Sequence, residues 1–323
     1  MTQNPTPKTC LGLLVWAIVC LLPLDGDGII WWATRFILLA ALAWIPLALE
    51  LIGTTAESGV RLARLTQRLE PWAAIVLVGA CLAPAGSSLA VLLTVPWVLW
   101  TALLGLRGLL RLAERLLHRE RLLADELCID LGMLALPVGG IWLLAARANI
   151  PFVGFVQPIT LLTGMHFHFA GLLMPTVVGL TGRLLLPRGT TWRRYRVLAP
   201  VACLGTWLVA AGITFGGAAE TAGGTLFATL LTLTAVVLLV GAPARVLDRL
   251  ARALLIVALL APLPAMGLAA LYALSRGGLG NVSLETMAHV HGTLLAVVFV
   301  GVGLIALARI RPMSRLDRRL VLQ

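Results

Sequence analysis

The sequence is poor in charged residues. Only 12% of its 323 residues are charged, whereas 60% are hydrophobic and the mean hydropathy is +0.98. A soluble protein of this length needs a far more polar surface, so the composition excludes a water-soluble enzyme or binding domain. It predicts an all-α protein in which residues 1–323 form a single integral membrane domain.

Several common functional motifs are also missing. No glycine-rich nucleotide loop follows a strand-like segment, and there is no C-x-x-C pair or H-E-x-x-H helix. These absences argue against a soluble cofactor domain and against the most familiar zinc sites. No internal repeat supports an inverted-repeat transporter. The five cysteines lie in or beside apolar runs, where small packing residues are expected: Cys10, Cys20, Cys81, Cys128 and Cys203.

Apolar runs near 20 residues are abundant, and each is a candidate transmembrane helix. We expect about ten: 9–24, 28–52, 71–87, 88–108, 126–147, 155–182, 196–217, 222–243, 250–274 and 286–308. The third and fourth are separated by a short Pro/Gly/Ser loop, so a re-entrant hairpin is an alternative to two full crossings. The sequence therefore predicts a polytopic helical bundle.

The net charge of +11 follows the expected topology. Arginines concentrate in the connections after the even-numbered spans and in the C-terminal tail, and only Arg147 and Arg276 break the alternation. This pattern predicts cytoplasmic termini, a multi-pass protein of the cell (plasma) membrane, and no nucleic-acid partner. Residues 106–125 alternate arginine with leucine, which predicts an amphipathic helix in the cytoplasmic interface.

Four of the five histidines form two His-x-His pairs inside apolar runs. They are His166 with His168, expected near mid-membrane, and His289 with His291, expected in the outer half. Such histidines are costly in hydrocarbon and are functional candidates. Residues two apart on a helix point about 200° apart, so a regular helix cannot direct both imidazoles of one pair at one ion. The two pairs could share a cavity if their spans pack together.

Three interpretations of the histidines are consistent with the sequence. They could be structural hydrogen-bond partners, ligands of a haem or transition metal, or a metal-free acid–base or substrate site. Histidine exchanges protons near neutral pH, which favours the third interpretation.

Other polar or aromatic residues could contribute to such a site. Asp130 is either a proton carrier or a charge at a helix N-terminus, and Arg35 either snorkels outward or pairs with an anion. Trp142 is an interfacial anchor or the wall of an aromatic cavity. Glu285 lies four residues before His289 and could hydrogen-bond it.

Two stretches resemble the YndJ-like membrane protein family. One runs from Ile129-Asp130 through Leu136-Pro137-Val138-Gly139-Gly140-Ile141-Trp142 to Leu162-Thr163-Gly164-Met165-His166-Phe167-His168-Phe169-Ala170-Gly171, and the other is His291-Gly292. The resemblance is strongest over 125–185 and implies that Asp130, Trp142, Thr163, His166, His168 and His291 occupy family positions. The chain departs from the family's H-G-x-x-N-A by having Leu295, and His289 is atypical.

The leading hypothesis is an intramembrane enzyme that acts on a lipophilic small molecule, such as an isoprenoid or another lipid, in the bilayer. Acid–base chemistry would isomerise or cyclise it, as in a terpene cyclase that opens an epoxide, without a cofactor. The catalytic candidates are His166, His168, His291 and Asp130; the substrate-binding candidates are Trp142, Thr163, His289, Glu285 and Arg35. The alternatives are a transporter or channel with a histidine proton or cargo site, and a haem or metal protein with the four paired histidines as ligands.

Overall fold

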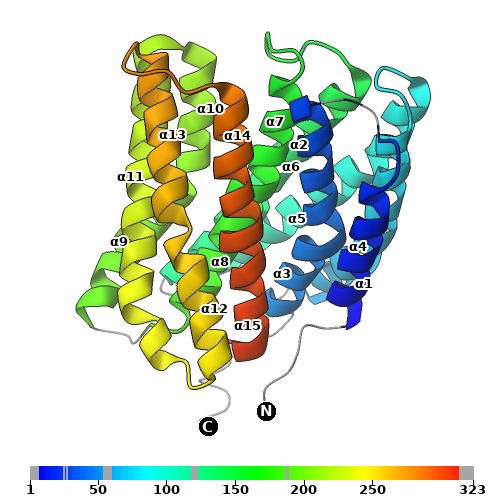
Figure 1. Ribbon diagram of the computed structural model, residues 1–323. Helices are drawn as coiled ribbons and strands as arrows, with labels where there is room; N and C mark the ends of the chain where they lie inside the picture. Colours follow the sequence, from blue (N-terminus) through cyan, green and yellow to red (C-terminus); the bar gives the residue numbers. More distant parts are fainter. Residues whose placement is uncertain are drawn as a thin grey trace. The chain divides into compact units, whose positions relative to one another are not determined.

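The computed structural model describes residues 7–24, 26, 28–53, 60–117, 123–185 and 189–312. These residues are overwhelmingly helical, and they contain one isolated β-bridge, between Phe152 and Phe155, and no strand (Figure 1). The prediction of an all-α, polytopic membrane protein is confirmed.

Every predicted apolar run coincides with helical structure. In chain order the elements are α1 (Pro7–Cys20), α2 (Gly28–Leu39), the π-helix η1 (Ala40–Trp44), α3 (Ile45–Ile52), α4 (Val60–Leu82), α5 (Ser88–Leu117), α6 (Ala124–Ala148), α7 (Ile159–His166), the π-helix η2 (Phe167–Leu173), α8 (Met174–Gly182), α9 (Thr190–Cys203), α10 (Gly205–Phe215), α11 (Gly217–Gly241), the 3-10 helix η3 (Pro243–Arg245), α12 (Arg249–Leu260), α13 (Pro262–Arg276), α14 (Leu284–Thr293), the π-helix η4 (Leu294–Val302) and α15 (Gly303–Ile310).

Eight helices of the described chain are long and apolar enough to cross a membrane. They are Gly28–Ile52, Ser88–Leu117, Ala124–Ala148, Ile159–Gly182, Thr190–Phe215, Gly217–Arg245, Arg249–Arg276 and Leu284–Ile310. Helix α1 is apolar but has only 14 residues, and the first half of α4 carries charged side chains. The count of ten spans and the cytoplasmic location of the termini therefore stay predictions.

The described chain divides into two compact units, and the prediction of a single integral membrane domain stays a prediction. The N-terminal unit comprises Pro5–Arg121 and Gly132–Leu173, and the C-terminal unit comprises Leu122–Leu131 and Met174–Gln323 together with Met1–Asn4. The first histidine pair belongs to the N-terminal unit and the second to the C-terminal unit.

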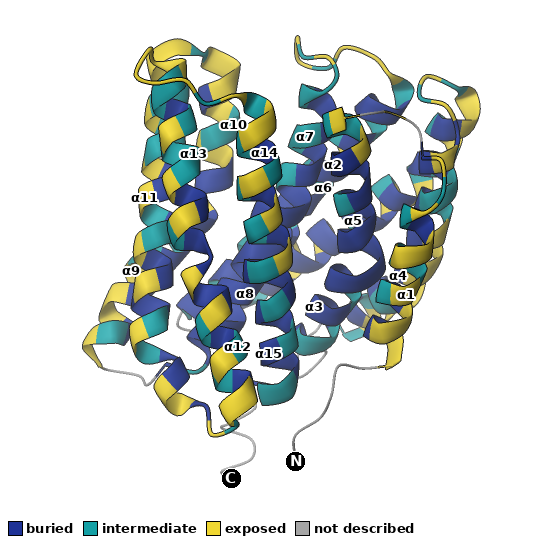
Figure 2. Ribbon diagram, viewed as in Figure 1, coloured by how far each residue is buried: buried dark blue, intermediate teal, exposed yellow. Residues whose placement is uncertain are grey.

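The N-terminal unit is packed through glycines. A Cβ atom at Gly105 of α5 would lie 2.4 Å from Cγ of Pro137, and one at Gly140 of α6 would lie 2.4 Å from Oγ1 of Thr101. These distances mean that α5 and α6 approach so closely that only glycine fits at these positions, as is common between membrane helices. The helix from α2 to α3 is almost completely buried, as its dark blue ribbon in Figure 2 shows.

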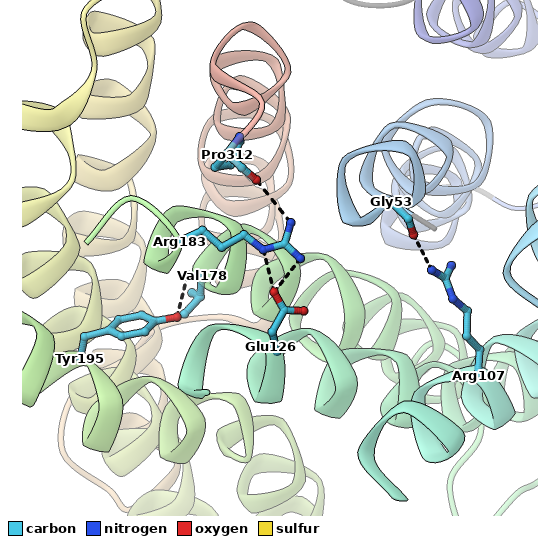
Figure 3. A network of polar contacts seen from close by, with 7 residues as sticks. All are labelled: Gly53, Arg107, Glu126, Val178, Arg183, Tyr195 and Pro312. Atoms are coloured by element: carbon cyan, nitrogen blue, oxygen red, sulfur yellow. Dashed lines mark hydrogen bonds and ion pairs between the residues drawn. The ribbon is translucent and has the colours of Figure 1, made fainter. Parts of the chain in front are cut away.

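The C-terminal unit also has a close approach at a glycine, and it contains a buried ion pair. A Cβ atom at Gly182 would lie 2.0 Å from the hydroxyl oxygen of Tyr195. Arg183, just after α8, pairs with Glu126 of α6 at 2.8 Å, and both side chains are almost fully buried (Figure 3). Truncating one partner would leave the other charge buried and unpaired, which is strongly destabilising.

Four buried arginines donate to backbone carbonyls at the C-terminal ends of helices. Their acceptors are Cys20 and Leu22 for Arg35, Gly53 for Arg107, Ala83 for Arg147 and Pro312 for Arg183. The last carbonyls of a helix lack intrahelical donors and carry partial negative charge, so a guanidinium stabilises them. Figure 3 shows two of these contacts, Arg107 with Gly53 and Arg183 with Pro312.

The two arginines that break the charge alternation both have local partners. Arg147 is only 2% exposed and donates to the carbonyl of Ala83, just beyond α4. Arg276 pairs with Glu220 at 3.1 Å. Both exceptions are therefore bonded to other groups of the protein.

Residues 106–117 are the last turns of α5 and not a separate helix. Arg107, Arg111 and Arg115 lie on a buried face of this stretch, while leucines such as Leu109 and Leu117 are exposed. The location of this helix in the cytoplasmic interface stays a prediction. The rest of the predicted interfacial segment lies largely outside the described residues.

Candidate functional site

In the N-terminal unit, the first histidine pair lies where α7 crosses α6. A Cβ atom at Gly164 would lie 3.2 Å from the backbone nitrogen of Leu143, and one at Gly139 would lie 3.0 Å from Nδ1 of His168. Gly164 therefore allows α7 to pack closely against α6. The π-helix begins at Phe167, between the two histidines, so the helix changes geometry within the pair. Such π segments are frequent at functional sites.

His168 is fully buried, and both of its ring nitrogens have partners. Nδ1 lies 2.7 Å from the carbonyl oxygen of Gly164, and because a carbonyl can only accept, Nδ1 carries the proton. Nε2 accepts a hydrogen bond of 2.9 Å from Nε1 of Trp97, and the two rings lie nearly parallel, with centroids 5.9 Å apart. His168 is therefore a neutral imidazole with its hydrogen-bonding capacity filled.

Trp97 is a residue of this site that the sequence analysis missed. It is fully buried and stacks on Trp100 at 4.8 Å, and Trp100 donates to the carbonyl of Thr66 at 2.9 Å. The signal was present, because two tryptophans three residues apart share one face of a helix. That spacing does not reveal that Trp97 bonds His168, which lies 71 residues away.

The other predicted residues of this unit lie on α6, in the case of Trp142, and on α7, in the case of Thr163 and His166. His166 is partly buried, with its ring edge-on to Phe167, and Thr163 is partly buried as well. Trp142 packs edge-on against Phe152 at 4.9 Å, in the loop between α6 and α7. This places Trp142 in an aromatic cluster.

Arg35 has a structural role at the end of α1. Its guanidinium bonds backbone carbonyls of Cys20, Leu22 and Trp31 and lies 3.6 Å above the Trp31 ring. Its own carbonyl accepts from Nε1 of Trp16 at 2.8 Å. The side chain reaches toward the end of a helix, as snorkelling predicts, but it is buried and caps protein carbonyls.

His291, in the C-terminal unit, is held through one nitrogen only. Its Nδ1 donates to the carbonyl of Ala265 on α13 at 3.0 Å. Its Nε2 has no hydrogen bond within the described part of the chain, and the side chain is only partly buried. A fixed imidazole with an available Nε2 lone pair can accept a proton or bind a ligand.

The neighbours of His291 on α14 differ from the sequence expectation. Glu285 is exposed and makes no hydrogen bond to His289, so the expected i, i+4 pair is not formed. Ser283 caps the helix instead, accepting from the backbone nitrogen of Thr286 at 3.0 Å. Asp130, in the part of α6 that belongs to this unit, is fully buried.

The span that carries His291 is anchored at its other end. Arg309 on α15 donates to Asp248 through Nε at 3.0 Å and through Nη2 at 2.8 Å. Arg183 bonds the carbonyl of Pro312 just beyond this helix. Together with the contact to Ala265, these bonds fix the helix at both ends of its path through the unit.

Within the described ranges, no group of three or more His, Cys, Asp or Glu side chains is arranged to hold a metal ion. His168 has no nitrogen to offer while it is bonded to Trp97 and Gly164.

The chain was compared with known families and proteins. The family model described as YndJ-like protein matches residues 35–299, which extends the likeness well beyond the region that the motifs marked. The uncharacterized membrane protein YndJ of Bacillus subtilis (strain 168) is 34% identical over 123 residues, which cover 37% of this chain and only 20% of that relative. No solved structure matches the chain. Because the family model covers most of its length, the chain belongs to the YndJ-like family.

Proposed function

We propose that this protein is an intramembrane enzyme that acts on a lipophilic small molecule by proton transfer, with His291 as the transferring group. The observation that carries the proposal is the asymmetry of its imidazole: Nδ1 is fixed on the carbonyl of Ala265, and Nε2 is available. A general base needs a positioned nitrogen with a free lone pair, and a backbone acceptor at the other nitrogen sets the required tautomer.

The surroundings of His291 suit a lipophilic substrate. The two residues that flank it are Val290, which is exposed, and Gly292, and the helix continues into the apolar segment η4. A substrate that is itself hydrocarbon can approach from the bilayer. We expect the protein in the plasma membrane and assign it no resident cofactor.

The chemistry follows from what an imidazole can do. Nε2 can remove an acidic C–H proton and return it, as imidazolium, to another carbon of the same molecule, which isomerises the substrate. An imidazolium can also protonate an epoxide oxygen, but it is too weak an acid to protonate an unactivated alkene. Asp130, in the same unit, is the carboxylic acid we propose for such a step.

In this proposal His168 has a positioning role and not a catalytic one. Its bond to Trp97 joins α5 to the π-helical segment of the Ile159–Gly182 span, and its other bond is to Gly164 of α7. The loss of His168 would therefore lower the stability of this packing and affect catalysis only indirectly. His166, Thr163 and Trp142 remain predicted site residues of the N-terminal unit.

The test is deuterium incorporation into lipids. The purified full-length protein in nanodiscs is incubated in heavy water with a total extract of polar lipids and isoprenoids, and the extract is analysed by mass spectrometry. Protons on an imidazole exchange with solvent, so we expect at least one species to gain deuterium with wild type and not with His291→Ala.

A result in which no lipid gains deuterium in a His291-dependent manner would reject the enzyme hypothesis. The same preparations in proteoliposomes measure proton flux. Flux that depends on His291, without labelling of any lipid, would support the transporter or channel instead.

A further inference from the structure

Glu70 is a buried carboxyl that the sequence analysis did not single out. It lies in α4, one residue before the apolar run 71–87, and is only 3% exposed. Its Oε1 atom is buried and has no hydrogen-bond partner within the described chain. An ionised carboxylate in this position would lose its hydration without receiving hydrogen bonds in return, which is costly.

No donor compensates for the burial of Glu70 Oε1 within the described chain. The side-chain amide of Gln67, three residues earlier on the same face of the helix, donates instead to the carbonyl of Leu49 at 3.2 Å. A buried carboxyl without donors is less costly in its neutral form than as a carboxylate.

The charges near this part of α4 do not offset the cost of burial. Burial raises the pKa of Glu70 to about 8, although the positive charge of Lys8 on α1 lowers it. The helices packed against α4 also carry charged side chains: Arg35 on α2, Glu50 on α3, and Arg107, Arg111, Glu114 and Arg115 on α5, while α4 itself carries Arg61, Arg64 and Arg68. Lys8 is the charge that acts on Glu70.

We infer that Glu70 is a proton-binding site of the N-terminal unit, whose buried carboxyl without hydrogen-bond donors holds a proton. On release, the carboxylate is attracted by the positive charge of Lys8 on α1. The site is separate from His291, and its test does not depend on any enzymatic activity.

The experiment is an infrared titration of the full-length protein in nanodiscs. A protonated carboxyl has a C=O stretch distinct from the bands of a carboxylate. In wild type we expect one such band at neutral pH that disappears on alkaline titration with a midpoint at about 8. The band should be missing in Glu70→Gln and retained in Glu285→Gln, because Glu285 is exposed.

A second variant keeps the inference testable if Glu70→Gln does not fold. Lys8→Gln removes the positive charge, so the midpoint of the band should move to higher pH. Three results would each overturn the inference: no protonated-carboxyl band in wild type at neutral pH, the same band in Glu70→Gln, or a midpoint that Lys8→Gln leaves in place or lowers.

Discussion

His168 and His291 make the same first contact and differ in the second. Each donates from Nδ1 to a backbone carbonyl, of Gly164 in one case and of Ala265 in the other. Nε2 of His168 accepts a hydrogen bond from Trp97, whereas Nε2 of His291 has no hydrogen bond within the described chain. Membership in a His-x-His pair therefore does not determine whether the second nitrogen is bonded. In the proposed function, the state of this nitrogen separates the packing histidine from the one that transfers protons.

The largest effect on stability should come from His168→Ala. The variant removes a fully buried imidazole, which leaves a cavity, and it leaves the indole N–H of Trp97 without an acceptor. Removing a large buried side chain costs about 3–5 kcal/mol. Chemical unfolding in detergent, followed by tryptophan fluorescence, measures the loss. A variant as stable as wild type would mean that the two histidines do not differ as described.

Trp97→Phe should have a smaller effect because it keeps an aromatic ring and removes only the donor. The unsatisfied Nε2 of His168 would then cost about 1–3 kcal/mol. The double variant with His168→Phe separates the hydrogen bond from packing, since Trp97→Phe should cost less when no imidazole is present. Equal costs in the two backgrounds would argue against this bond as a stabilising contact.

His291→Ala should change stability less again. The side chain is partly buried and makes one hydrogen bond, which contributes about 0.5–1.5 kcal/mol. Its deuterium labelling of lipids should nevertheless be lost, although the protein stays folded. The comparison fails if His291→Ala unfolds as readily as His168→Ala.

The architecture was largely predictable from sequence. Long apolar runs fix the helices, because a backbone in hydrocarbon must satisfy its own hydrogen bonds. The close packing at Gly164 could be anticipated for the same local reason, since a small residue lets two backbones approach. Signals of this kind lie within a few consecutive residues, so they can be recognised from the sequence alone.

The details of the site were not predictable, because they depend on contacts between distant residues. The partner of His168 is 71 residues away, and that of His291 is 26 residues away. The sequence alone would place Arg147 at a solvated end of its span. Its bond to the carbonyl of Ala83, 64 residues away, is visible only in the structure. The sequence alone would place Glu70 at the membrane interface as a charged residue, because none of the residues next to it in the sequence indicates that it is buried.

Asp248→Asn should give the smallest effect, and it tests how the helix of His291 is held. The Asp248 carboxylate caps α12 through the backbone nitrogens of Leu250 and Ala251, at 2.9 and 3.3 Å, and binds Arg309. Desolvation raises the pKa of Asp248, but the hydrogen bonds from Arg309 and from the two backbone nitrogens outweigh it and lower the pKa below the ordinary 3.8. The folded state therefore gains stability from this carboxylate above that pH and loses it as the pH falls further.

Asparagine can still cap the helix but cannot pair with Arg309, so the variant isolates the anchor of α15. We expect a slightly lower unfolding temperature than wild type at neutral pH, and a difference that shrinks on acidification because the wild-type carboxylate then becomes protonated. If the anchor positions His291, labelling of lipids should fall in this variant while it remains folded at neutral pH. Unchanged labelling would show that the bond to Ala265 alone is sufficient to orient the imidazole.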